Sequence, residues 1–140
     1  MVTTLCPYLN FPGTAREAMT FYQEVFGGEL TVTTFRQLGA LPADHAAADQ
    51  VMHSELRGPV VVLCAADVPE GVAPVTLTRG NDVNLALMGD DEAQVRVWFE
   101  ALSDGADVEM PLARQIWGDL YGSLTDRFGV GWMANVRIAG

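Results

Sequence analysis

The sequence predicts an α+β fold in which a βαβββ module occurs twice in tandem. Two observations carry this prediction. Strand-like and helix-like patterns follow one another in the same order in both halves of the 140-residue chain. The residues that end the two helix-like segments also match, since residues 21–25 (FYQEV) align with residues 98–102 (WFEAL) and a glycine follows three positions after each. An internal repeat of this kind governs the assignment of the fold.

A connector separates the two repeats. Residues 69–82 contain two prolines and two glycines, which interrupt helices and strands. The sequence therefore divides into a first βαβββ module over residues 1–68, this connector, and a second βαβββ module over residues 83–140. The length suits one compact domain assembled from two half-domains.

The first module begins with a strand over residues 4–11. Thr14 and Glu17 then form a capping-box pattern, in which a hydroxyl and a carboxylate satisfy amides of the first helical turn. Apolar residues follow at helical spacing until Gly27 and Gly28 end the helix. A loop over residues 38–50 interrupts the three strands that complete the module, which are expected over residues 30–35, 51–56 and 60–65.

The second module repeats this order. A strand over residues 83–88 precedes a helix that Asp91 caps with Gln94 as its box partner, and Gly105 ends that helix. Glycines at the turns separate the strands that follow. These strands are expected over residues 108–117, 120–125 and 132–138.

Charge and apolar patterning exclude several classes of partner. The net charge is −10, and the eight basic residues are scattered rather than clustered. Nucleic acids and anionic membranes require a basic face, so we exclude both. No apolar run has the length of a membrane span and the chain starts without a signal-peptide pattern, so we expect a cytoplasmic protein. The acidity favours solubility and, as an alternative, the attraction of a cationic small molecule.

Several short stretches together resemble one protein superfamily. These stretches are residues 7–11 (PYLNF), 15–18 (AREA), 21–22 (FY), 25–28 (VFGG), 53–56 (HSEL) and 117–133. The doubled βαβββ arrangement is similar to the vicinal oxygen chelate fold of glyoxalase I, extradiol dioxygenases, fosfomycin-resistance enzymes and bleomycin-binding proteins. The residue match is closer to its PhnB-like branch. The resemblance implies a curved mixed sheet with a cleft (a glyoxalase-like fold), a small-molecule ligand and a homodimer.

The metal site of this superfamily is altered in the sequence. Metal-using members hold a divalent ion with four side chains, usually His and Glu, from the first, fourth, fifth and eighth strands. None of the corresponding residues is His, Asp or Glu, so we predict no metal and no cofactor. We expect Cys6 and Cys64 to be buried and reduced. The alternative is that their thiolates bind zinc. The mapped positions are Cys6 or Pro7, Leu63 or Cys64, Asn84, and Met133 or Asn135.

Strand alternation predicts which side chains line the cleft that the resemblance implies. On the third strand, Val51, His53 and Glu55 are expected to share one face. The cleft would be polar and aromatic, and such walls can stack a planar ring and hold it with a few hydrogen bonds. The candidate ligand-binding residues are His53, Glu55, Asn84, Tyr121 and Asn135, with Trp117 and Arg36 near the rim.

Three functions follow from this combination. The leading hypothesis is a metal-free, homodimeric PhnB-like protein that binds an undefined small molecule. The second is sequestration of a cationic or aromatic antibiotic, as in the bleomycin-binding relatives. The third is an enzyme: a metal-dependent lyase or dioxygenase, or a catalyst that transfers protons through His53 and Glu55. The simpler interpretation of these two residues is a solvent-facing polar pair, and whether the protein is an enzyme stays open at this point.

Overall fold

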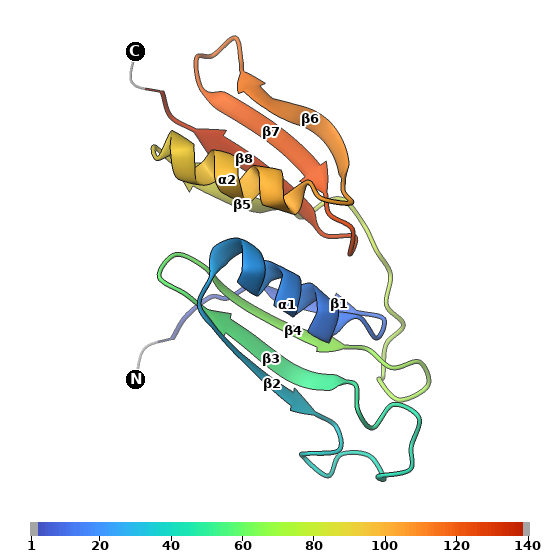
Figure 1. Ribbon diagram of the computed structural model, residues 1–140. Helices are drawn as coiled ribbons and strands as arrows, with labels where there is room; N and C mark the ends of the chain where they lie inside the picture. The colour runs from blue at the N-terminus through green and yellow to red at the C-terminus, as the bar shows by residue number, and fades with distance from the viewer. Residues whose placement is uncertain (1–2, 139–140) are drawn as a thin grey trace. The chain divides into compact units, whose positions relative to one another are not determined.

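The computed structural model describes residues 3–138. The chain divides into two compact units, the first ending at Thr78 and the second beginning at Arg79. Each unit contains one helix and one four-stranded mixed sheet (Figure 1). The order of elements is βαβββ in both units, which confirms the α+β class and the tandem modules predicted from the sequence.

The first unit places its opening strand beside its last one. The sheet order is β1-β4-β3-β2, with β1 parallel to β4 and with β3 antiparallel to both of its neighbours. β1 begins later than expected because Pro7 has no amide hydrogen for a ladder, although its carbonyl accepts from the Cys64 amide (3.0 Å). The elements are β1 (Tyr8–Phe11), α1 (Ala15–Phe26), β2 (Glu29–Thr34), β3 (Val51–Arg57) and β4 (Val62–Asp67).

One face of this sheet packs against α1 (Figure 1). Burial alternates over residues 54–57 of β3, as expected for a sheet with one covered face, whereas residues 63–67 of β4 are all buried. The opposite face carries mostly polar and sulfur-containing side chains. The core of the first unit includes Phe11, Ala15, Ala18, Met19, Phe21, Tyr22, Val51, Leu56, Leu63 and Ala65.

The start of α1 is capped by a residue that the sequence did not suggest. The Thr14 side chain makes no capping hydrogen bond. Instead, the buried carboxylate of Asp67 accepts from the backbone N–H groups of Gly13 (3.0 Å) and Ala15 (2.9 Å) through Oδ1. Its Oδ2 accepts from the N–H of Val51 (2.9 Å). The capping-box prediction was therefore wrong, because the carboxylate of Asp67, at the end of β4, caps the helix N-terminus in place of the Thr14 hydroxyl.

A bulge in β3 corrects one expected face. Thr33 pairs with His53 whereas Thr34 pairs with Val51, so Met52 is an extra residue in the ladder. The extra residue rotates Val51 onto the α1 side, where it is 1% exposed. His53 and Val51 therefore do not share a face, contrary to the strict alternation that the sequence predicts.

The second unit repeats the topology with the order β5-β8-β7-β6, and β5 runs parallel to β8. Asp91 caps its helix as predicted, since its Oδ1 accepts from the Gln94 N–H (3.1 Å). Val95, Phe99 and Leu102 of that helix are buried. The elements are β5 (Leu85–Gly89), α2 (Glu92–Leu102), β6 (Asp107–Arg114), β7 (Leu120–Thr125) and β8 (Gly131–Val136). Within residues 3–138, neither helix has the length and apolar character that crossing a membrane requires.

Candidate ligand-binding surfaces

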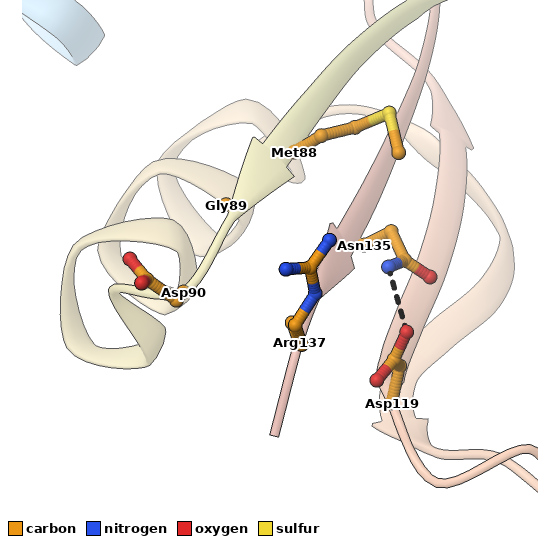
Figure 2. Close-up of a pocket in the computed structure, with 6 residues that line it drawn as sticks. All are labelled: Met88, Gly89, Asp90, Asp119, Asn135 and Arg137. Carbon is orange, nitrogen blue, oxygen red and sulfur yellow. Dashed lines mark hydrogen bonds between the residues drawn. The ribbon is translucent and has the colours of Figure 1, made fainter. Parts of the chain in front are cut away.

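A pocket of about 480 Å³ lies in the second unit, where β5 and β8 end and β7 begins. Figure 2 shows residues that lie in β5 and β8, or directly beside the ends of these three strands, around the same space. The pocket contains one residue of the predicted set, Asn135. Its lining residues are Met88, Gly89, Asp90, Asp119, Asn135 and Arg137.

Strand pairing places Asn135 at the centre of a row. It lies opposite Met88 of β5 on one side and opposite Tyr121 of β7 on the other. The Asn135 Nδ2 donates to Asp119 Oδ2 (3.1 Å), the contact drawn as a dashed line in Figure 2. The backbone N–H of Ile138 donates to the other carboxylate oxygen of Asp119 (3.4 Å). One donor therefore holds each oxygen of Asp119.

The pocket carries charges of both signs. Asp90 and Asp119 lie on either side of the Arg137 side chain in Figure 2. The backbone N–H of Arg137 donates to the Gly89 carbonyl (2.8 Å), which fixes the residue after β8 against the end of β5. A guanidinium is a fork of donors and a carboxylate accepts only, so the pocket can both donate hydrogen bonds and accept them.

Two aromatic residues lie at the Tyr121 end of this row. The rings of Trp117 and Tyr121 meet edge to face, with centroids 5.9 Å apart. Trp117 is 56% exposed. It was expected at the end of a strand, but β6 ends at Arg114 and a turn closes instead, with the Gln115 N–H donating to the Asp119 carbonyl (2.9 Å). Tyr121 is on β7 as predicted and adjoins Asn135 directly.

Asn84 does not join the pocket. The sequence placed it inside the fifth strand, but β5 begins one residue later, at Leu85. Its exposed side chain lies beside Gly131, where a Cβ atom would collide with it. Asn84 is thus at the opposite end of β5 from Met88 and Gly89, which line the pocket.

His53 and Glu55 lie in the first unit on the sheet face away from α1, each with a separate partner. The Tyr8 hydroxyl is 2.9 Å from His53 Nδ1, and their ring centroids are 5.7 Å apart. Arg57 Nη2 donates to Glu55 Oε1 (3.0 Å). The predicted acid–base pair is therefore divided between two contacts, Tyr8–His53 and Glu55–Arg57.

Both cysteines belong to the same face. Cys64 lies opposite Tyr8 on one side and Glu55 on the other. Its sulfur is 3.7 Å from the Cys6 sulfur. Burial, together with the hydrogen bond and charge of Cys6, raises the pKa of Cys64 to about 11. Burial, and secondarily the charge of Cys64, also raises the pKa of Tyr8. Sequence reasoning missed Tyr8, although its alternation with Cys6 on the first strand could have indicated it.

Arg36 has a structural partner. It follows β2 and forms a two-pronged ion pair with Asp49, at 2.7 Å from Nε to Oδ1 and 3.2 Å from Nη2 to Oδ2. The Arg36 N–H also donates to the Ala48 carbonyl (2.8 Å). These contacts fasten the two ends of residues 36–49, and the hydrogen bond and charge of Arg36 lower the pKa of Asp49.

The residues at the mapped metal positions do not fit a divalent ion held by His and Glu. The first unit offers two sulfurs, of Cys6 and Cys64, and the second offers the neutral side chains of Asn84, Met133 and Asn135. Within residues 3–138, no three His, Cys, Asp or Glu side chains converge so as to hold a metal ion. Imidazole and carboxylate ligands are what such ions prefer.

Residues 8–134 match the model of the Glyoxalase/Bleomycin resistance protein/Dioxygenase superfamily. The chain belongs to this superfamily. Protein YjdN of Escherichia coli K12, a relative, is 26% identical over 140 aligned positions that cover 94% of each chain. Full-length agreement of this kind assigns both βαβββ units to the glyoxalase-like fold.

Solved structures agree with this membership of the glyoxalase superfamily. Protein PA1353 from Pseudomonas aeruginosa is 33% identical and superposes with a TM-score of 0.81, covering 97% of this chain and 98% of its own. The PhnB protein from Bacillus cereus is 19% identical with a TM-score of 0.75, covering 96% and 100% of the two chains. The second likeness concerns the fold alone.

Proposed function

We propose that this glyoxalase-superfamily protein binds a small molecule in the pocket of its second unit, without a divalent metal ion. The pocket itself carries the proposal. Its volume of about 480 Å³ is within the range that small-molecule sites occupy. It brings together Asp90, Asp119, Asn135 and Arg137, whose side chains can orient a polar ligand.

The pocket retains hydrogen-bonding capacity for a ligand. A carboxylate has about four acceptor positions. The two oxygens of Asp119 each accept one bond, from Asn135 and from the Ile138 amide. These bonds orient Asp119 and leave it able to accept from a ligand, which is the preorganisation that a binding site needs.

The charges and the neighbouring rings favour a cationic, aromatic ligand. Two carboxylates and one guanidinium line the pocket, and the chain as a whole carries −10. Such a balance attracts cations. Tyr121 lies opposite the pocket residue Asn135 and contacts Trp117, and these two rings supply faces for a planar ring of a ligand. This observation favours antibiotic sequestration as the second candidate function.

Metal-dependent lyase or dioxygenase chemistry has weaker support. Such a reaction needs an ion that polarises substrate oxygens. The mapped positions of the second unit, Asn84, Met133 and Asn135, offer amides and a thioether in place of imidazole and carboxylate. Proton transfer through His53 and Glu55 also has weaker support, because these residues are engaged by Tyr8 and Arg57.

Calorimetric titration tests the proposal with two probes, metal-free bleomycin and the cationic dye acridine orange, both in buffer with EDTA. We expect saturable binding. We expect Asn135→Ala and Asp119→Asn each to weaken binding about tenfold, or ~1.4 kcal/mol. Asn10→Ala and Asp107→Asn are matched controls on exposed strand positions outside the pocket, and should bind as the wild type does.

Two results would contradict the proposal. Binding that the pocket variants do not weaken would place the ligand elsewhere. Binding that appears only after a divalent ion is added would restore metal-dependent chemistry. If neither probe binds, the cationic, aromatic ligand class is wrong.

A further inference from the structure

We propose that Cys6 and Cys64 are a redox-modification site, a dithiol that a hydroperoxide closes to an intramolecular disulfide. The two sulfurs are 3.7 Å apart on the face of the first sheet that points away from α1. The inference does not depend on the proposed ligand, because the pair is in the other unit and its oxidation is measured without a ligand.

The strand register brings the two sulfurs together. β1 and β4 run parallel with Tyr8 opposite Cys64, and the Cys64 N–H donates to the Pro7 carbonyl (3.0 Å). Cys6 lies two residues before Tyr8 and therefore turns its side chain to the same face. The Cys6 thiol is also 3.5 Å from the Val62 carbonyl. Backbone contacts on both sides of the pair thus maintain its proximity.

The two cysteines differ in exposure and in position relative to the strands, and this difference gives each a separate role in the reaction. Cys6 is part-exposed and precedes β1, whereas Cys64 is 8% exposed and lies within β4. A disulfide requires the sulfurs to approach to about 2.05 Å. Residue 6 can make this movement without breaking the β1–β4 ladder, which begins at Tyr8. Cys6 is therefore the thiol that a small oxidant reaches.

The surroundings support this order. Burial raises the pKa of Cys64 to about 11, so Cys64 stays a thiol at neutral pH and does not compete for the oxidant.

The reaction balances in two steps. The Cys6 thiolate attacks one peroxide oxygen, the O–O bond breaks, and the leaving alkoxide takes a proton to become an alcohol. Cys6 is then a sulfenic acid. The Cys64 sulfur attacks the Cys6 sulfur, the S–O bond breaks, and hydroxide leaves with the Cys64 proton as water. Two thiols and one hydroperoxide thus give one disulfide, one alcohol and one water.

Intact-protein mass spectrometry tests the proposal on the full chain, reduced, freed of reductant and treated with tert-butyl hydroperoxide. We expect the loss of two hydrogen atoms, a cross-linked peptide joining Cys6 to Cys64, and full reversal by dithiothreitol. Cys64→Ser should accumulate a sulfenic acid on Cys6 that dimedone traps. Cys6→Ser should keep Cys64 reduced while the wild type is fully oxidised.

Three outcomes of the oxidation experiment would overturn the proposal. The first is that Cys6→Ser is oxidised as fast as the wild type. The second is that disulfides form only between chains, and the third is that oxygen is added without a disulfide forming within the chain. Circular dichroism verifies that each variant is folded, and Cys6→Ala and Cys64→Ala replace any serine variant that is not. The protein as purified could also resist oxidation because it retains zinc. If EDTA removes that zinc and restores the oxidation, the pair is a metal site instead.

Discussion

Asp67 is the residue on which three segments of the first unit converge. Its carboxylate accepts from Gly13 and Ala15 at the start of α1 and from Val51 at the start of β3. It is 5% exposed, so water cannot replace these bonds. Charged acceptors at a helix N-terminus are also favoured by the helix dipole.

We predict that Asp67→Asn lowers the free energy of unfolding by about 1–3 kcal/mol, because an amide nitrogen would replace one of the two acceptor oxygens and face a backbone donor. Urea denaturation measures the change. Asp44→Asn, at an exposed loop position, is the matched control and should leave the midpoint unchanged. Equal midpoints for the two variants would contradict this account of Asp67.

At the scale of elements, β6 and β7 approach each other unusually closely at Gly122. A Cβ atom there would lie 2.9 Å from the Leu112 Cα and from the Phe99 ring. Because Leu112 contributes backbone, it cannot rotate away. We predict that Gly122→Ala destabilises the second unit by about 1–3 kcal/mol through overpacking.

Thermal unfolding followed by circular dichroism measures the effect of Gly122→Ala. Gly89→Ala is the matched control, since a Cβ at Gly89 meets nothing within 4 Å. A lowered midpoint for both variants would show that the loss comes from glycine replacement in general. An unchanged midpoint for Gly122→Ala would contradict the close approach.

The strands show which features of the fold could be predicted from the sequence and which could not. Apolar alternation predicted β7 over residues 120–125, where the structure has it, and placed Tyr121 and Asn135 on adjoining strands. It could not give the register that sets Met88 opposite Asn135, because one strand's pattern says nothing about its neighbour's offset. The Met52 bulge and the cap from Asp67 are equally invisible, since each depends on a residue distant in the chain.

Strand ends account for two further differences. Trp117 was predicted within a strand, but the Gln115–Asp119 turn takes it out of the ladder, and Gly118 adopts a φ of 100° there. Asn84 precedes β5 rather than lying within it, as residues 83–88 had been expected to form the strand. Both residues fit a strand by composition. The exact end of a strand is decided by pairing, which a single segment does not encode.

At the scale of the whole molecule, we predict that the purified, untagged protein retains less than about a tenth of an equivalent of metal. The prediction follows from the residue types at the mapped positions, which offer few of the ligands that iron, nickel, manganese and zinc prefer. Elemental analysis after incubation with each ion and removal of the excess tests it. Near-stoichiometric retention, also seen in a Cys6→Ala/Cys64→Ala variant, would mean that the position mapping is wrong.

We also propose that the protein is a homodimer, as the resemblance to its superfamily implies. Large apolar side chains are exposed in both units, and association is one way to bury them. Examples are Leu5, Val60, Val75, Val83, Val97 and Ile116. Sedimentation equilibrium measures the mass directly; a monomer of 15.1 kDa at micromolar concentration would contradict the proposal.

The parallel pairing of the first strand with the last in each unit has a consequence for synthesis on the ribosome. β1 is synthesised early but has no partner strand until β4 has been synthesised. The backbone N–H and C=O groups of β1 therefore stay hydrated while the residues between β1 and β4 are translated. The first sheet is complete once Asp67 has emerged from the ribosome, before β5 has emerged. The second sheet then repeats the delay between β5 and β8. Folding during translation would therefore occur in two separate steps, the first when β4 becomes available to pair and the second when β8 does.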